Sequence, residues 1–87
     1  VQTVSKEMKE YVATFHTHLG ALLTYRVLQQ LHIVAYMAPV PRKLSASCGT
    51  CVFYKAVTPE LTMLAQEVES VYEITGEDAY LLIYENC

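Results

Sequence analysis

Short apolar runs of two different periods alternate along this chain, and their order restricts the folds that it can adopt. Tyr11–Phe15 alternates bulky and small side chains and is rich in strand-forming residues, which predicts a β-strand. The following apolar residues recur at helical spacing, which predicts a helix over residues 19–31 that Thr17 can cap. Its predicted buried stripe consists of Leu19, Leu22, Leu23, Val27 and Leu31. Ile33–Ala38 is a continuous apolar run that predicts a buried second strand.

The second half of the chain repeats this order of strand and helix. Cys51–Lys55 predicts a third strand. Thr58-Pro59-Glu60 then combines a capping hydroxyl, a proline suited to the first helical position and a carboxylate near the positive helix end, which predicts a second helix. Its predicted buried stripe consists of Leu61, Leu64, Ala65 and Val68. Val71–Thr75 is predicted to be the fourth strand.

The resulting order, β-α-β-β-α-β, is that of a ferredoxin-like sandwich, an α+β fold in which two helices cover one antiparallel sheet. We therefore predict a single domain over residues 1–87, with a core at about 11–75 and a C-terminal extension at 76–87. Within the extension, Tyr80–Tyr84 favours an added strand, whereas Thr75 followed by Asp78 is compatible with a short helix.

The predicted topology also places the one long irregular segment of the chain, residues 39–50. Strands one and two run in the same direction, and strand three pairs with strand one in this fold. The entrance to strand three, Cys48–Cys51, should therefore lie beside Phe15–His18 and the N-terminus of the first helix. A set of polar residues that are far apart in the sequence thus becomes one candidate site.

Cys48 is the residue of this site that is best suited to chemistry, because a cysteine reacts as its thiolate. A helix N-terminus or a nearby cation lowers the pKa of a thiol, and the site combines a helix start, two histidines and two basic residues. Two serine hydroxyls can solvate the thiolate, and a glycine permits close approach of a partner or a positive φ. These candidate binding residues are Arg42, Lys43, Ser45, Ser47, Gly49, His16 and His18.

Three other interpretations of the two neighbouring cysteines stay open. Cys48 and Cys51 can be small side chains packed at a strand entrance. Their C-x-x-C spacing also matches a thiol–disulfide redox pair, although a strand rather than a helix follows. With His16 and His18 they form a Cys₂His₂ set that could hold zinc, but one C-x-x-C is a weak metal signal. No metal or cofactor is therefore predicted.

Charge and composition disfavour several classes of partner. The net charge is −3, no Lys or Arg follows Lys55, and most acidic residues lie from Glu60 onward, so nucleic acid is not predicted as a partner. No apolar run approaches the roughly 18 residues that span a bilayer, so no membrane association is predicted. The three cysteines are an odd number, and two lie close together, which predicts a reducing compartment and hence a cytoplasmic protein.

Three motifs, Phe15-His-Thr-His18, Ala21-Leu22 and Pro39-Val-Pro-Arg-Lys-Leu-Ser-Ala-Ser-Cys-Gly49, resemble a family of small uncharacterised bacterial domains described as putative selenium/sulfur carrier-like proteins. The resemblance covers roughly residues 11–54 and implies that Cys48 is the family's cysteine, downstream of its proline-arginine pair. Two positions depart from the family pattern. Tyr25 stands where a Glu is expected, and Cys51 stands where an apolar residue is usual.

The resemblance implies an accessory protein that carries activated sulfur or selenium, rather than a turnover enzyme. Cys48 would accept the atom as a persulfide or selenide from a donor protein and pass it to an acceptor protein, with Cys51 as a candidate resolving thiol. A second hypothesis is a non-catalytic interaction or assembly module that docks a partner, or forms a homo-oligomer, through an exposed sheet or the acidic C-terminal third. Only the first hypothesis depends on Cys48.

Overall fold

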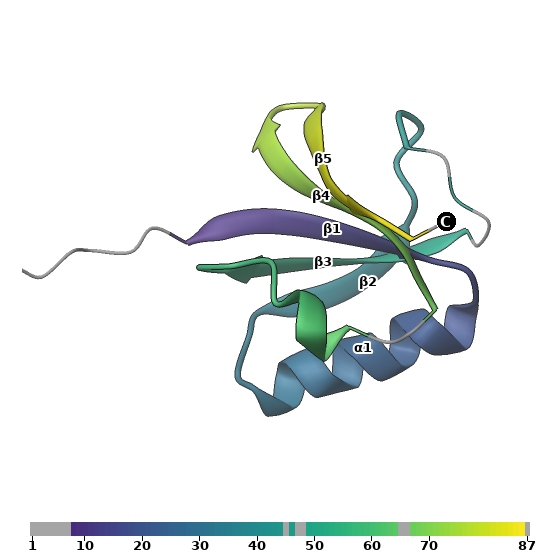
Figure 1. Ribbon diagram of the computed structural model, residues 1–87, viewed down its shortest axis with the longest axis vertical. Coiled ribbons are helices and arrows are strands. Elements are labelled where there is room, and N and C mark those ends of the chain that lie inside the picture. Colours follow the sequence, from purple (N-terminus) through teal and green to yellow (C-terminus); the bar gives the residue numbers. More distant parts are fainter. Residues whose placement is uncertain (1–7, 45, 47–48, 65–66, 87) are drawn as a thin grey trace, which may run out of the picture.

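In the computed structural model, which describes residues 8–44, 46, 49–64 and 67–86, a five-stranded antiparallel sheet carries one α-helix on one face (Figure 1). The chain is therefore α+β, as the sequence predicts. The elements, in chain order, are β1 (Lys9–Phe15), α1 (His18–Gln30), β2 (Ala35–Pro39), β3 (Thr50–Ala56), the 3₁₀ turn η1 (Leu61–Met63), β4 (Val68–Gly76) and β5 (Ala79–Glu85).

Strand β1 lies at the centre of the sheet, whose order is β2-β3-β1-β4-β5. It pairs with β3 on one side and with β4 on the other, and both pairs are antiparallel. Because β2 is also antiparallel to β3, β1 and β2 run in the same direction. The predicted pairing of strands one and three is thus confirmed. The predicted added strand is confirmed as well, since β5 pairs with β4 along the sheet edge.

Helix α1 begins where the sequence predicts, but it buries a different face. The Gly20 backbone N–H donates to Thr17 Oγ1 at 3.0 Å, so Thr17 caps the helix. The predicted leucine stripe is wrong, because Leu19 and Leu23 are 59% and 43% exposed. The buried residues of the helix are Gly20, Ala21, Thr24 and Leu28.

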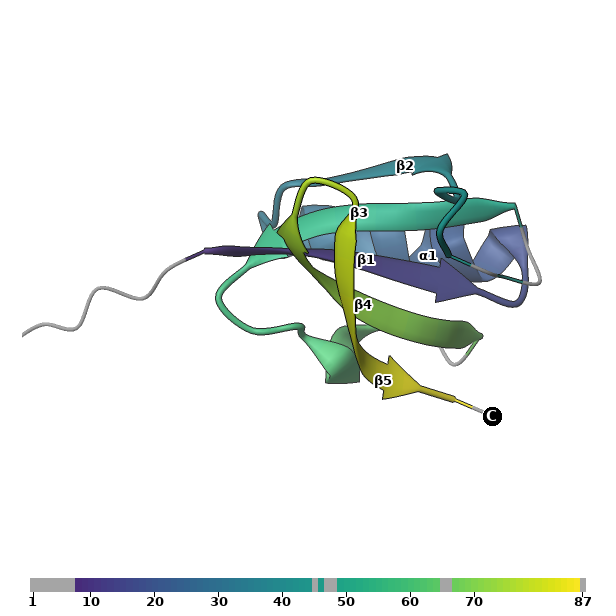
Figure 2. The ribbon, with the colours of Figure 1, turned by 90° about the horizontal axis from the view of Figure 1, so that it is seen from above.

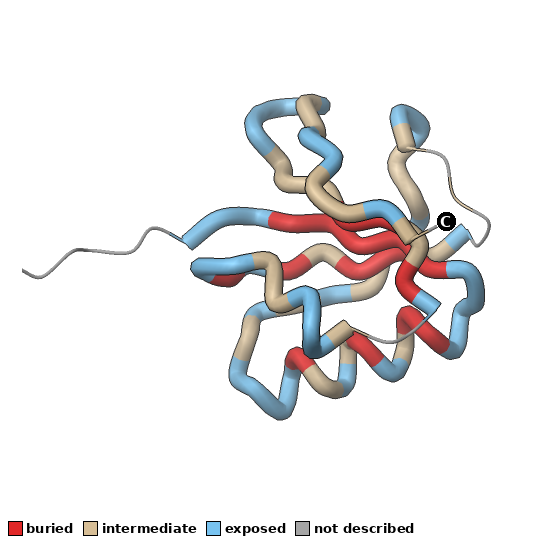
Figure 3. The backbone as a smooth tube through the Cα atoms, in the orientation of Figure 1, coloured by how far each residue is buried: buried red, intermediate tan, exposed pale blue. Residues whose placement is uncertain are grey.

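Small side chains on the buried face bring α1 close to the rest of the chain (Figure 3). A Cβ atom added to Gly20 would lie 2.7 Å from the Cβ atom of Glu67, closer than real Cβ atoms approach. Near the same point, the His16 backbone N–H donates to the Glu67 carbonyl at 2.8 Å. The core beneath the helix is formed by central-strand residues that include Tyr11, Ala13, Phe15, Val52, Tyr54 and Val71.

The predicted second helix is wrong for the described residues, where η1 is the only helical segment after α1. Glu60, expected in the first helical turn, has a φ of 54° and a left-handed conformation. The Thr58 hydroxyl donates to a Glu60 carboxylate oxygen at 3.0 Å instead of capping a helix. A ferredoxin-like sandwich with two helices is therefore not formed by the described residues, and Ala65 lies outside them.

Chain length explains why the helix signal at residues 57–67 is overridden. Strands β3 and β4 are both antiparallel to β1, so the segment between them must return along the whole length of a strand. Seven residues of β3 span about 23 Å at 3.3 Å per residue, whereas residues 57–67 would span about 16 Å as a helix. Parallel strands usually need a dozen or more connecting residues. β4 begins at Val68, the last residue of the predicted helical stripe, so this connection stays short.

Strand β2 lies at an edge of the sheet, and the expectation of a buried second strand is wrong. None of its residues is buried, and Tyr36 is 57% exposed. Pro39 is its last residue, which an edge strand tolerates because one side of the strand makes no ladder hydrogen bonds.

Two segments of the chain stand on the sheet face opposite α1 (Figure 2). The β4–β5 hairpin curls away from the helix, and the chain after β2 rises on the same side (Figure 1). The two are joined where Lys43 Nζ donates to the Asp78 carbonyl oxygen at 2.7 Å. We call this side of the sheet the open face.

We predict that Gly20→Ala lowers the free energy of unfolding by about 1–3 kcal/mol, the usual cost of overpacking, because the new methyl group would meet Glu67. Urea denaturation measures this change. Gly49→Ala is the matched control, since no atom lies within 4 Å of a Cβ atom at Gly49. Equal or greater stability of Gly20→Ala would contradict the close contact, because alanine is otherwise the better helix former.

Candidate functional site

The start of α1 and the entrance to β3 lie together, as the predicted topology requires. His18 Nδ1 is 3.3 Å from Thr50 Oγ1, and both groups are exposed enough to meet a partner. One residue further along β3, Cys51 pairs in register with Thr14 of β1 and Ala38 of β2. Thr50, which the sequence analysis did not single out, is therefore the residue that links the helix start to this segment.

Cys48, Ser45 and Ser47 lie outside the described residues, so their roles stay predictions. Gly49 follows Cys48 directly, and its carbonyl oxygen accepts a hydrogen bond from the Val40 N–H at 3.1 Å. The glycine at position 49 was expected to permit either a positive φ or the close approach of a partner. No glycine among the described residues has a positive φ. The space beside the Gly49 Cα atom is open, which keeps the expected close approach of a partner available.

Cys51 is fully buried in β3, and its Sγ atom lies 3.7 Å from the Pro39 carbonyl oxygen. Burial raises the pKa of the Cys51 thiol to about 11, because an environment poor in water disfavours the charged thiolate. The thiol is thus protonated at neutral pH and is a poor nucleophile. A resolving role for Cys51 would require the strand entrance to open first.

The two basic residues of the predicted site differ in the contacts that they make. Arg42 and Lys43 are both exposed in the segment after β2. The contact with Asp78 commits the Lys43 ammonium group to the β4–β5 hairpin. The ion pair that the described residues form, between Lys55 and Glu10, does not involve Arg42. Arg42 is therefore the better candidate for a cation that faces an incoming thiolate or persulfide.

The two histidines also differ in their placement. His16 is exposed in the turn between β1 and α1, and its backbone contacts Glu67. Among the hydrogen bonds of the described residues, only the one made by His18 joins a histidine ring to the β3 entrance. Within that part of the chain, no three His, Cys, Asp or Glu side chains are grouped to hold a metal ion. None of the helices described there is long and apolar enough to cross a membrane.

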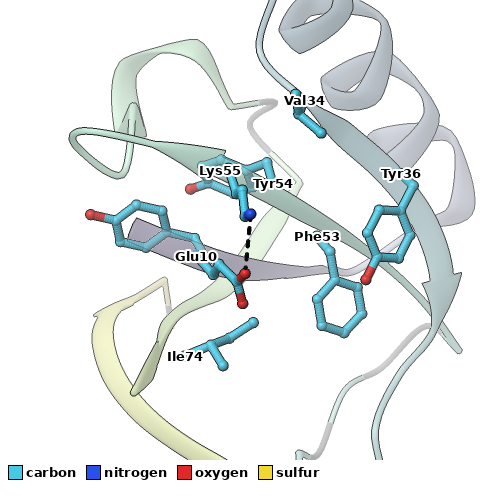
Figure 4. A pocket seen from close by; sticks show the side chains of 8 residues that line it. Glu10, Val34, Tyr36, Phe53, Tyr54, Lys55 and Ile74 are labelled. Atoms are coloured by element: carbon cyan, nitrogen blue, oxygen red, sulfur yellow. Dashed lines mark ion pairs between the residues drawn. The ribbon is translucent and has the colours of Figure 1, made fainter. Parts of the chain in front are cut away.

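A separate cavity of about 290 Å³ lies on the open face, and the sequence analysis missed it (Figure 4). Its lining includes Glu10 and Lys55, which form an ion pair across β1 and β3. The available signal was the opposite charges of Glu10, just before one predicted strand, and Lys55, at the end of another. Their meeting depends on strand register, which the sequence does not specify.

We predict that Cys51 reacts with iodoacetamide about a hundredfold more slowly in the native protein than in the urea-unfolded protein at pH 8. The raised pKa, about 11 against an ordinary 9.0, reduces the thiolate fraction by that factor, and packing slows the reaction further. Mass spectrometry of a Cys48→Ser/Cys87→Ser variant measures Cys51 alone. Equal rates in the two states would show that Cys51 is accessible and reactive.

Comparison with known proteins places the chain in a family. Residues 10–75 match the family model described as "Putative Se/S carrier protein-like". A stretch of 46 residues is 33% identical to "Uncharacterized protein YtiA" of Escherichia coli (strain K12), and it covers 53% of this chain and 54% of that protein. The chain thus spans about half the length of the curated relative it matches. No solved structure matches significantly. This chain belongs to the Se/S carrier protein-like family.

Proposed function

We propose that this protein carries activated sulfur or selenium on the thiol of Cys48. The thiolate would attack the outer sulfur of a donor's persulfide, form a new S–S bond at Cys48 and release the donor's thiolate. Transfer to an acceptor repeats the exchange, with the acceptor's thiolate attacking the outer sulfur and Cys48 leaving as a thiolate. The selenium reaction is the same, with selenium as the outer atom. No net oxidant is consumed in either step.

The contact between His18 and Thr50 is the observation that carries this proposal. Thr50 is two residues from Cys48 in the chain, and His18 is the first residue of α1. The α1 N-terminus is the positive end of the helix dipole, and such a position favours a thiolate over a thiol. The family membership supports the general carrier role, and the register of β3 supports this location for it.

The environment of Cys51 favours a mechanism that uses one cysteine. A resolving thiol must become a thiolate and reach the loaded sulfur, and burial opposes both. Release of cargo through an acceptor's thiol needs no contribution from Cys51. The same exchange needs Cys48 to stay reduced between cycles, which suits a reducing compartment such as the cytoplasm.

The test is mass spectrometry after incubation with a cysteine desulfurase and cysteine. We expect one added sulfur on Cys48 that is removed by dithiothreitol, because an outer persulfide sulfur is reducible. Cys51→Ser should load as the unmodified protein does, and Cys48→Ser should not load. Absence of added sulfur on Cys48, or equal loading of Cys48→Ser, would reject the proposal.

Charge reversal separates the roles of the two basic residues. We predict that Arg42→Glu slows sulfur loading several-fold and raises the pKa of Cys48, because a nearby positive charge favours the thiolate. Lys43→Glu should have a smaller effect, because the Lys43 ammonium is bound to the Asp78 carbonyl. The pH dependence of Cys48 alkylation measures both variants in a Cys51→Ala/Cys87→Ala background. Equal effects of the two reversals would contradict this assignment.

A protein-interaction module is the second candidate, and exposed apolar side chains on the helical side favour it. Leu19 and Leu23 of α1 are exposed, and Leu23 lines a shallow cavity together with Met63 of η1. A carrier must contact its donor and its acceptor, so such a surface serves either function. Retention of cellular function by Cys48→Ser, together with its loss on Leu23→Glu, would favour the module.

A further inference from the structure

The open face carries a pattern that the carrier proposal does not use. Strand register places Ile74, Glu10 and Lys55 side by side in one row across β4, β1 and β3. Two residues further along the strands, the next row consists of Tyr72, Val12, Phe53 and Tyr36. One negative and one positive charge therefore stand next to each other, with apolar side chains around them.

These rows border the cavity of about 290 Å³ (Figure 4). Val34 and Tyr36 line it from the β2 side, and Ile74 lines it from the β4 side. The Tyr36 and Phe53 rings stack with their centroids 5.2 Å apart and their planes 10° from parallel, which makes one firm apolar wall. Ligand pockets usually measure about 300–1,000 Å³, so this cavity suits a small metabolite.

The ion pair in this cavity is weak enough to be exchanged for a ligand. Lys55 Nζ lies 3.5 Å from Glu10 Oε2, and each side chain is 53% exposed. Solvent screening leaves such exposed pairs little net stability, so parting the two groups costs little when each gains a new partner. A ligand with a single charge would leave one of the two groups without its partner.

We propose that this cavity binds a free α-amino acid with an apolar side chain. The ligand's carboxylate pairs with the Lys55 ammonium, and its ammonium group pairs with the Glu10 carboxylate. The ligand's side chain lies on the Tyr36–Phe53 wall and against Ile74. Both charged groups of the cavity lining are then paired, and the apolar surface around them is covered.

This site is distinct from the entrance to β3. Glu10 is four residues along β1 from Thr14, the register partner of Cys51, which separates the two places by about 13 Å. Amino-acid binding therefore does not depend on the proposed chemistry of Cys48. A Cys48→Ser variant should bind the same ligands unchanged.

The experiment is an NMR titration of the ¹⁵N-labelled protein with L-leucine. We expect saturable shifts in Glu10, Tyr36, Phe53, Lys55 and Ile74. Isoamylamine lacks the carboxylate of leucine, isocaproate lacks the ammonium group, and glycine lacks the side chain. Each should bind at least tenfold more weakly than leucine. Absence of saturable shifts at these residues, or equal binding of either singly charged analogue, would overturn the proposal.

Matched variants test the assigned contacts. Lys55→Gln and Glu10→Gln should each weaken leucine binding at least tenfold, while Lys9→Gln and Glu85→Gln, exposed strand positions outside the cavity lining, should not. The variants should fold, because an exposed ion pair contributes little stability. Urea denaturation checks this. Unchanged leucine binding in Lys55→Gln and Glu10→Gln would assign the shifts to another mode of binding and reject the proposed one.

Discussion

The antiparallel pairing of β1 with β3 is the constraint on which the rest of this structure depends. One end of the ladder joins Thr14 to Cys51 and brings the β3 entrance beside the α1 N-terminus. Four residues away, the same register joins Glu10 to Lys55 and creates the charged row of the open face. A shift by one residue would turn both sets of side chains to the opposite face of the sheet. Two chemically different places thus depend on one register.

The close approach of α1 makes the first of these places possible. The helix is capped by Thr17, and Gly20 leaves room for the Glu67 side chain against its first turn. Because these contacts hold the helix start, His18 reaches Thr50 without being buried itself. The Leu19 and Leu23 side chains of α1 are left largely exposed on the outside, whereas Leu28 is fully buried. Packing distance, rather than hydrophobicity alone, selected the buried face of this helix.

The two neighbouring cysteines of the C-x-x-C motif illustrate how far a candidate site can be predicted. Pattern and topology correctly brought the β3 entrance to the helix start, and the family resemblance is confirmed by the match over residues 10–75. The spacing of the cysteines suggested a redox pair, yet Cys51 is a packed core residue with a raised pKa. A motif specifies the distance between two residues along the chain, whereas desolvation depends on strands that are distant in the sequence.

Short stretches of sequence were enough to predict the elements that depend on local signals. These are β1, the capped helix α1 and the strands that follow each turn. Tertiary structure decided the rest. The Thr58-Pro59-Glu60 helix signal is overridden because residues 57–67 must return along a strand and are too few to do so as a helix. The edge position of β2 and the meeting of Glu10 with Lys55 depend on strand order and register. These are contacts between distant segments, and their energies outweigh the propensity of any single segment.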